Sequence, residues 1–283
     1  MEIVLALGSA LLFALGSVLQ QKAGIDAPSS GASSGVLLRM ARRPVWLGGI
    51  AADALGYVAQ AAALGIGRLA VVQPLLVTSV VFALPLGMML TGLRAHRTDL
   101  AAAVLVVIAV VGFLLISRPD GGRNEAPLGD WVAAMAVCGA VCLPLVLAGR
   151  RGPAPRRAAM LGAAAGILFA LSAALTKAVV DELHRGLPHV LAGWQLYALA
   201  VVGYVSMTLN QLALNTGALA ATLATSTALD PIASVALGLT LFAESPRTGG
   251  AELVGTLAAL AVALGGIVTL ARAEAHVPAP TRP

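Results

Sequence analysis

The composition of this 283-residue chain is that of a protein embedded in a lipid bilayer. Hydrophobic residues make up 59% of it and charged residues only 11%. Soluble domains carry about 25% charged residues, so these values exclude a soluble fold and make the bilayer the expected surroundings. The formal net charge of +5 fits the Lys and Arg that membrane proteins keep in cytoplasmic loops, and it predicts no nucleic-acid partner.

Nine apolar stretches follow one another along the chain, each about as long as a membrane-crossing helix. They are residues 3–21, 46–66, 70–91, 99–117, 130–148, 158–180, 191–214, 219–242 and 252–271. Glu2 stands where a signal peptide would have basic residues, so the first stretch is interpreted as a span. With the N-terminus outside, twelve Lys and Arg fall in inner loops and the tail and five in outer loops. This bias predicts a plasma (inner) membrane protein with its C-terminus in the cytoplasm.

Five short sequence matches recur in the same order in the two halves of the chain. Leu12-Phe-Ala-Leu15, Trp46, Gly56-Tyr-Val58, Ala63-Leu-x-x-Gly67-x-Leu-Ala70 and Arg97-Thr98 return at Leu168, Trp194, Gly203, Ala213 and Arg247. Because five spans precede the sixth, the second half enters the membrane upside down. We therefore expect an all-α integral membrane protein with inverted four-helix repeats at 1–117 and 158–272. Residues 118–157, with span 5, link the repeats, and 273–283 form a disordered tail. This organisation is typical of secondary transporters.

Acidic residues within the spans are the first candidates for a functional site. Asp230 lies eleven residues into its span, about 17 Å deep at 1.5 Å per residue, and Pro231 follows it directly. A charge at mid-bilayer costs at least ~2.5 kcal/mol, so Asp230 is predicted to bind a proton, a cation or a metal ion. The alternative is a neutral Asp hydrogen-bonded to a neighbouring helix. The same two interpretations apply to Asp53, about 10 Å into span 2.

Uncharged polar side chains in the spans form a second group of candidates. The amides are Gln60, Gln73, Asn210 and Gln211. They offer oxygens to a cation or hydrogen bonds to a polar solute, or they serve as interhelical hydrogen bonds. Tyr57 and Tyr204, at matching positions of spans 2 and 7, either flank a central cavity or pack between helices. Lys22 and Lys177, at the ends of spans 1 and 6, are expected to extend to the membrane surface.

Several motifs of other protein classes are missing from the sequence. There is no phosphate-binding loop and no G-x-S-x-G motif, and all four histidines fall outside the predicted spans. The two cysteines, Cys138 and Cys142, are one helical turn apart, which is neither a disulfide framework nor a zinc pattern. We therefore expect no enzyme activity and no cofactor. Gly162-x-x-x-Gly166 predicts close helix packing within the chain, with a homodimer face as the alternative.

The order of these features resembles the drug/metabolite transporter superfamily, and most closely its NIPA-type magnesium transporters. The matching segments are Gly16-Ser-Val-Leu-Gln-Gln-Lys22, Trp46-Leu-Gly48, Leu69-Ala-Val-Val-Gln-Pro-Leu75, Leu175-Thr-Lys177, Gln211-Leu-Ala-Leu-Asn215, and Pro231 with Leu241-Phe-Ala-Glu244. The resemblance covers nearly the whole chain. It implies nine spans. It also implies transport by alternating access, in which a site for a small solute or cation, including Mg²⁺, opens to each side of the membrane in turn.

The chain departs from the NIPA-type pattern at two acidic positions. Gly56-Tyr57 stands where those proteins carry a glutamate in span 2, and Thr91-Gly-Leu-Arg94 lacks the acid that many relatives place after span 3. Divalent ions of this kind prefer several carboxylate oxygens. A proton-coupled exporter of a small organic metabolite or drug is therefore the alternative to a magnesium carrier. A non-transporting membrane scaffold is the alternative from a different class.

Overall fold

The structure is a computed structural model that describes residues 1–25, 43–91, 122–123, 125–216 and 218–244, with six single positions between 101 and 112 and Gly265. The described residues form helices and connecting loops, with no strand among them. Seven helical segments, with Leu69–Thr91 counted as one, are long and apolar enough to cross a membrane. The chain is therefore a helical membrane protein.

The helices occur in the order that the sequence predicts. Their bounds are α1 (Glu2–Ile25), α3 (Pro44–Ile66), α4 (Leu69–Leu76), α5 (Ser79–Thr91), α7 (Leu128–Gly149), α8 (Ala154–His184), α9 (Leu187–Ala192), α10 (Trp194–Leu214) and α11 (Leu219–Leu241). Predicted spans 1, 2, 5, 6 and 8 each correspond to one helix. Most of spans 4 and 9, and the whole tail 273–283, lie outside the described residues.

The predicted span 70–91 is confirmed as Leu69–Thr91, which is long and apolar enough to cross a membrane, and a turn at residues 77–78 divides it into α4 and α5. At this turn the Thr78 hydroxyl donates to the Leu75 carbonyl over 2.6 Å. Pro74, inside α4, also removes the N–H that would bond to the Ala70 carbonyl. The predicted span 191–214 corresponds to α10, and Gly193 separates α10 from the short α9 before it.

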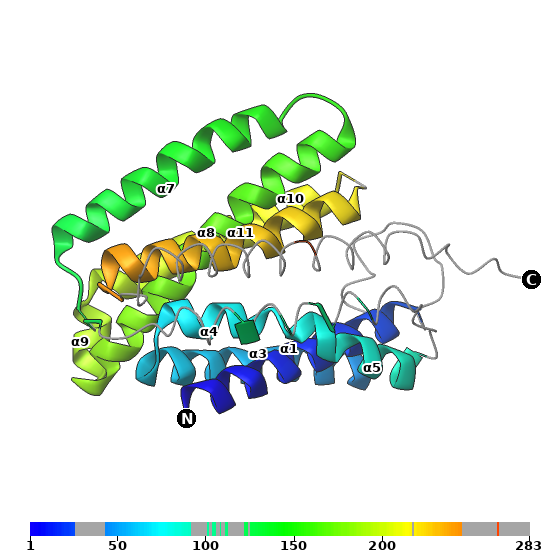
Figure 1. Cartoon of the computed structure of the whole chain (residues 1–283), viewed down its shortest axis with the longest axis horizontal. Helices are drawn as coiled ribbons and strands as arrows, with labels where there is room; N and C mark the ends of the chain where they lie inside the picture. Colours follow the sequence, from blue (N-terminus) through cyan, green and yellow to red (C-terminus); the bar gives the residue numbers. More distant parts are fainter. Residues whose placement is uncertain are drawn as a thin grey trace, which may run out of the picture.

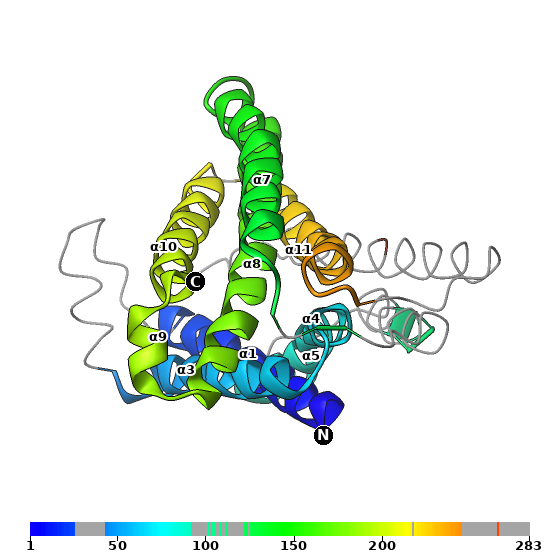
Figure 2. The same ribbon diagram turned by 90° about the vertical axis from the view of Figure 1, so that its left-hand side faces the viewer.

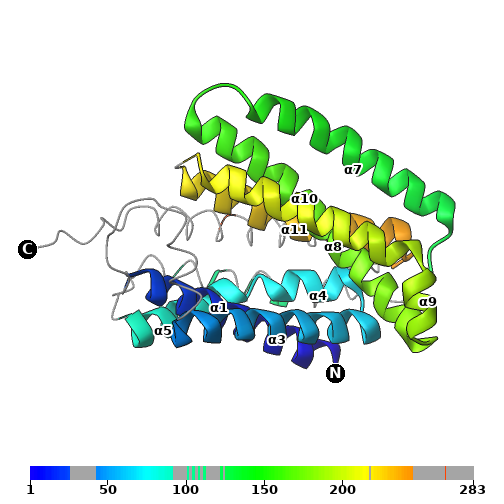
Figure 3. The same ribbon diagram turned by 180° about the vertical axis from the view of Figure 1, so that it is seen from behind.

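The helices form two layers that run side by side (Figure 1). One contains α1, α3, α4 and α5, and the other contains α7, α8, α10 and α11. Seen from the end, α10 and α11 flank α8, and α7 lies on the outside (Figure 2). Helix α8 packs against α3 and α4 of the first layer as well as α7, α10 and α11 of its own. The core of the molecule is therefore built around α8, as the view from behind also shows (Figure 3).

Glycines allow two helix pairs to approach at backbone distance. A Cβ at Gly49 of α3 would lie 3.0 Å from the Gly16 carbonyl oxygen of α1. A Cβ at Gly166 of α8 would lie 2.5 Å from the Ser226 carbonyl oxygen of α11. Small residues permit such contacts in membranes. The prediction that Gly162-x-x-x-Gly166 packs within the chain is confirmed, and α11 covers the face that a homodimer would have used.

Candidate functional site

Asp230 lies near the middle of α11, where α11 meets α8. A Cβ at Gly166 of α8 would lie 3.2 Å from the Asp230 backbone nitrogen. The Ser234 hydroxyl, one turn further along α11, donates to the Asp230 carboxylate over 3.3 Å. Pro231 has no N–H to donate to the Thr227 carbonyl, so that carbonyl lacks its helical partner. A carboxyl group and a backbone carbonyl without its helical N–H donor therefore lie within one turn of each other in a membrane-crossing helix.

Tyr57 of α3 lies in the opposite layer from Asp230, and the Asp230 charge contributes to the electrostatics at its phenol. The Tyr57 ring packs edge-on against Phe13 of α1, with 5.7 Å between ring centroids. Tyr57 is nevertheless 55% exposed. It therefore offers an exposed phenol from the first half of the chain, which senses the carboxyl group of the second half without a hydrogen bond between them among the described contacts.

Asp53 lies in a different environment from Asp230. Gln20 of α1 donates its amide N–H to the Asp53 carboxylate over 2.6 Å. A Cβ at Gly16 would collide with this carboxylate, which shows how closely α1 covers it. The contacts of Asp53 thus join α1 to α3, as the structural alternative for this residue predicts.

The remaining predicted residues are spread over several surfaces. Gln73 of α4 is 3% exposed, and its amide nitrogen has no hydrogen-bond partner among the described residues. Gln60 and Asn210 are partly buried, and Gln211 is exposed. Tyr204, with 74% of its surface exposed, faces away from the core. Within the described part of the chain, no three His, Cys, Asp or Glu side chains gather to hold a metal ion. Metal binding at Asp230 stays a prediction.

A cluster of charged side chains that the sequence reasoning missed lies at the junction of α3 and α4. Its members are Glu2, Arg68, Arg123, Lys177 and Glu244, and we call it the junction cluster. They line a cavity of about 350 Å³ together with the backbone at residues 65–67 and 122. The start of α1, the end of α3, the start of α4 and the segment after α11 all meet there. These helix ends therefore lie on the same side of the molecule.

Glu244 joins the end of α11 to the start of α4. Its two carboxylate oxygens accept the backbone N–H groups of Leu69 and Ala70 over 2.8 and 2.9 Å. The first N–H groups of a helix have no partner within the helix, and its N-terminus favours negative charge. Glu244 is only 2% exposed. Ala243 before it has a positive φ of 48°, a conformation that non-glycine residues rarely adopt. This turn directs Glu244 toward α4.

Lys177 joins α8 to the end of α3. Its ammonium donates to the backbone carbonyls of Leu64, over 3.3 Å, and of Gly67. It also lies 5.3 Å from the centre of the Phe242 ring. Lys177 is 6% exposed, so the expectation that it extends to the membrane surface is wrong. The last carbonyls of a helix lack partners within the helix, and a cation near them interacts favourably with the helix dipole.

The arginines and the N-terminal glutamate complete the junction cluster. Arg123 donates its backbone N–H to Phe242 over 2.6 Å and its side-chain Nε–H to Leu241 over 2.8 Å. Its guanidinium also pairs with Asp130 at the start of α7. The Glu2 carboxylate accepts the Arg68 backbone N–H over 3.0 Å. In the sequence, Glu244 stood out only through the family resemblance, because its partners are more than 170 residues away.

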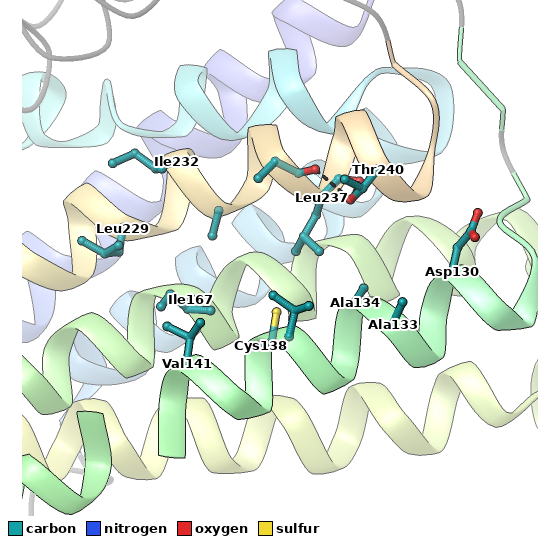
Figure 4. A pocket seen from close by; sticks show the side chains of 13 residues that line it. Asp130, Ala133, Ala134, Cys138, Val141, Ile167, Leu229, Ile232, Leu237 and Thr240 are labelled. Atoms are coloured by element: carbon teal, nitrogen blue, oxygen red, sulfur yellow. Dashed lines mark hydrogen bonds between the residues drawn. The ribbon is translucent and has the colours of Figure 1, made fainter. Parts of the chain in front are cut away.

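An apolar cavity of about 420 Å³ lies between α7, α8 and α11. Leu229, Ile232 and Leu237 of α11 lie across it from Cys138 and Val141 of α7, and Asp130 lies at one end (Figure 4). Both cysteines are buried free thiols. The lining offers no charged group other than Asp130, so this cavity suits an apolar occupant.

A comparison with known proteins finds a relative over almost the full length of the chain. The chain is 31% identical over 274 residues to the uncharacterized protein Cgl0250/cg0304 of Corynebacterium glutamicum. The alignment covers 96% of this chain and 95% of that protein. The chain belongs to the same family as this protein. No family model and no solved structure matches the chain.

Proposed function

We propose that the protein is a multi-pass secondary transporter of the drug/metabolite type, which moves a small solute or cation by alternating access. The observation that supports this most is the placement of Asp230. It lies near the middle of a membrane-crossing helix, next to a proline, and its carboxylate is hydrogen-bonded by Ser234 one turn away. Carboxyl groups at this depth are costly and commonly serve substrate or ion pathways.

The directions of the helices support an inverted repeat. Helix α1 begins at the junction cluster, whereas α8, its counterpart in the sequence repeat, has its last turns there. Each of the two contacts the second helix of its own half, since α1 packs on α3 and α8 packs on α10. Each also contacts the third, α4 and α5 in one half and α11 in the other. Oppositely oriented halves with matching contacts are found in many secondary transporters that work by alternating access. We place the N-terminal end outside, in the plasma (inner) membrane, from the distribution of Lys and Arg.

The surroundings of Asp230 favour a proton or an organic cation over a bare divalent ion. Its hydrogen-bond partner among the described residues is the Ser234 hydroxyl, whereas Mg²⁺ prefers several carboxylate oxygens and water. We propose that Asp230 alternates between a proton and a positively charged solute. A carrier of hydrated Mg²⁺ remains the second candidate through the resemblance to NIPA-type proteins.

Flux into proteoliposomes tests this function. Purified wild-type protein is reconstituted with an imposed pH gradient, and uptake of Mg²⁺ and of a panel of radiolabelled organic cations is compared with that of Asp230→Asn. We expect uptake of one class by the wild type and at most about 1% of that rate in the variant, because Asn cannot exchange a proton. Asp53→Asn is the matched control and should retain most of the activity. Equal flux in wild-type and Asp230→Asn vesicles would remove Asp230 from the mechanism.

A further inference from the structure

We infer that the Lys177 ammonium occupies a cation-binding site built into the α3–α4 junction, and that a small free cation binds there when the lysine charge is removed. The expected ligands are an alkali ion or a small alkylammonium ion. The inference concerns a site remote from Asp230, and it holds whether or not the protein transports a solute.

The groups that surround the ammonium are those that bind cations in proteins. The carbonyls of Leu64 and Gly67 accept its N–H groups, and both lie at the end of α3, where the helix dipole is negative. The face of the Phe242 ring lies 5.3 Å away, within the range of a cation–π contact. Carbonyl oxygens, an aromatic face and a helix C-terminus thus converge on one point.

The charges around the site offset part of the cost of burying a cation. Burial itself opposes a charge at Lys177, whereas Glu244, Glu2 and Asp181 stabilise the ammonium electrostatically and Arg68 opposes it. Glu244 is itself buried, and its two oxygens already accept N–H groups of α4. Without a positive charge in the site, this buried carboxylate would lose a favourable electrostatic partner, which is costly in a low-dielectric environment.

The site has room for a replacement ion. Lys177 lines the 350 Å³ cavity of the junction cluster together with the backbone at residues 65–67. Shortening Lys177 to Ala leaves the two carbonyls without their donor and enlarges this cavity. Gly67 lines this cavity, so a hydrated or partly dehydrated monovalent ion can approach its carbonyl from there. The Lys177 ammonium therefore fills the cation site while it stays attached to α8. Its contacts hold α8 against the α3–α4 junction.

Ion-dependent rescue of Lys177→Ala tests the inference. The melting temperature of the detergent-solubilised full chain is measured in NaCl, KCl, methylammonium chloride and N-methyl-D-glucamine chloride at equal ionic strength. We expect Lys177→Ala to melt several degrees below wild type in the bulky N-methyl-D-glucamine salt. It should regain about half of this loss in at least one small-cation salt, with a rise that follows the logarithm of the ion concentration.

Two further variants separate specific binding from a general salt effect. Lys177→Met fills the space with an uncharged chain and should be destabilised without rescue. Lys22→Ala, at the other lysine of the sequence, should match wild type in every salt. Equal melting of Lys177→Ala in all four salts, or an equal rise in wild type, would overturn the inference.

Amine labelling of the wild-type protein covers the case in which Lys177→Ala does not fold. The chain has two lysines, Lys22 and Lys177, so reductive methylation followed by mass spectrometry reads both. We expect Lys22 to be modified and Lys177 to be protected at least tenfold while the protein stays folded. Equal modification of the two amines would show that the ammonium is not held in a site, and would overturn the inference.

Discussion

Replacing Glu244 by Gln tests the contact that joins the two halves of the chain at the junction cluster. The carboxylate accepts two backbone N–H groups, from Leu69 and Ala70, over 2.8 and 2.9 Å. Hydrogen bonds to a charged group contribute about 1.5–3 kcal/mol each. Glutamine keeps one acceptor oxygen but places an NH₂ group against the second N–H. It also removes the negative charge from the N-terminus of α4, which is worth about 0.3–1 kcal/mol.

Together these losses predict that Glu244→Gln lowers the free energy of unfolding by about 2–4 kcal/mol. Glu182→Gln is the matched control, because Glu182 pairs with Arg185 at 3.6 Å in a partly exposed position. Such pairs contribute about 0–1 kcal/mol. The assay is unfolding by SDS titration of protein in mixed micelles, followed by circular dichroism. Equal unfolding midpoints for the two variants would refute the capping role of Glu244.

Two further predictions concern backbone geometry. Gly166→Ala should lower the free energy of unfolding by about 1–3 kcal/mol, because its Cβ would lie 2.5 Å from the Ser226 carbonyl oxygen. Gly203→Ala, whose Cβ meets nothing within 4 Å, should be neutral or stabilising by up to about 1 kcal/mol. The same SDS titration compares them, and equal stability would contradict the close approach of α8 and α11. The φ angle of Ala243 is 48°, which glycine adopts easily and a β-branched residue does not. The melting temperature of Ala243→Gly should therefore be no lower than that of wild type, and that of Ala243→Val should be several degrees lower. The reverse order of melting temperatures would contradict this.

The positions of the helices could be predicted from the sequence because hydropathy acts locally. A stretch of about 20 apolar residues in the bilayer must satisfy its backbone hydrogen bonds within itself, so it forms a membrane-crossing helix. Hydropathy does not register local breaks. The apolar stretch runs unchanged through Val77 and Thr78, yet a turn interrupts the helix there and the Thr78 hydroxyl bonds to Leu75. Gly193 between α9 and α10 is a second break of this kind.

The candidate site was only partly predictable, because its contacts join distant parts of the chain. Asp230 could be found from its depth alone, since a charge in the middle of a span is unusual. The pairing of Asp53 with Gln20 depends on which helix faces meet. Lys177 was misplaced because its partners are backbone carbonyls more than 100 residues away, and backbone groups leave no signal in the sequence.

Access to Tyr57 from the two sides of the membrane tests alternating access most directly. Tyr57→Cys is made in a background with Cys138 and Cys142 replaced by Ala, and a membrane-impermeant maleimide is added to either side of sealed vesicles. Leu143→Cys, on an exposed face of α7, is the lipid-facing control and should react from neither side. Our account predicts that Tyr57→Cys reacts from both sides, because the site opens to each in turn. Reaction from one side only, or from neither, would contradict it.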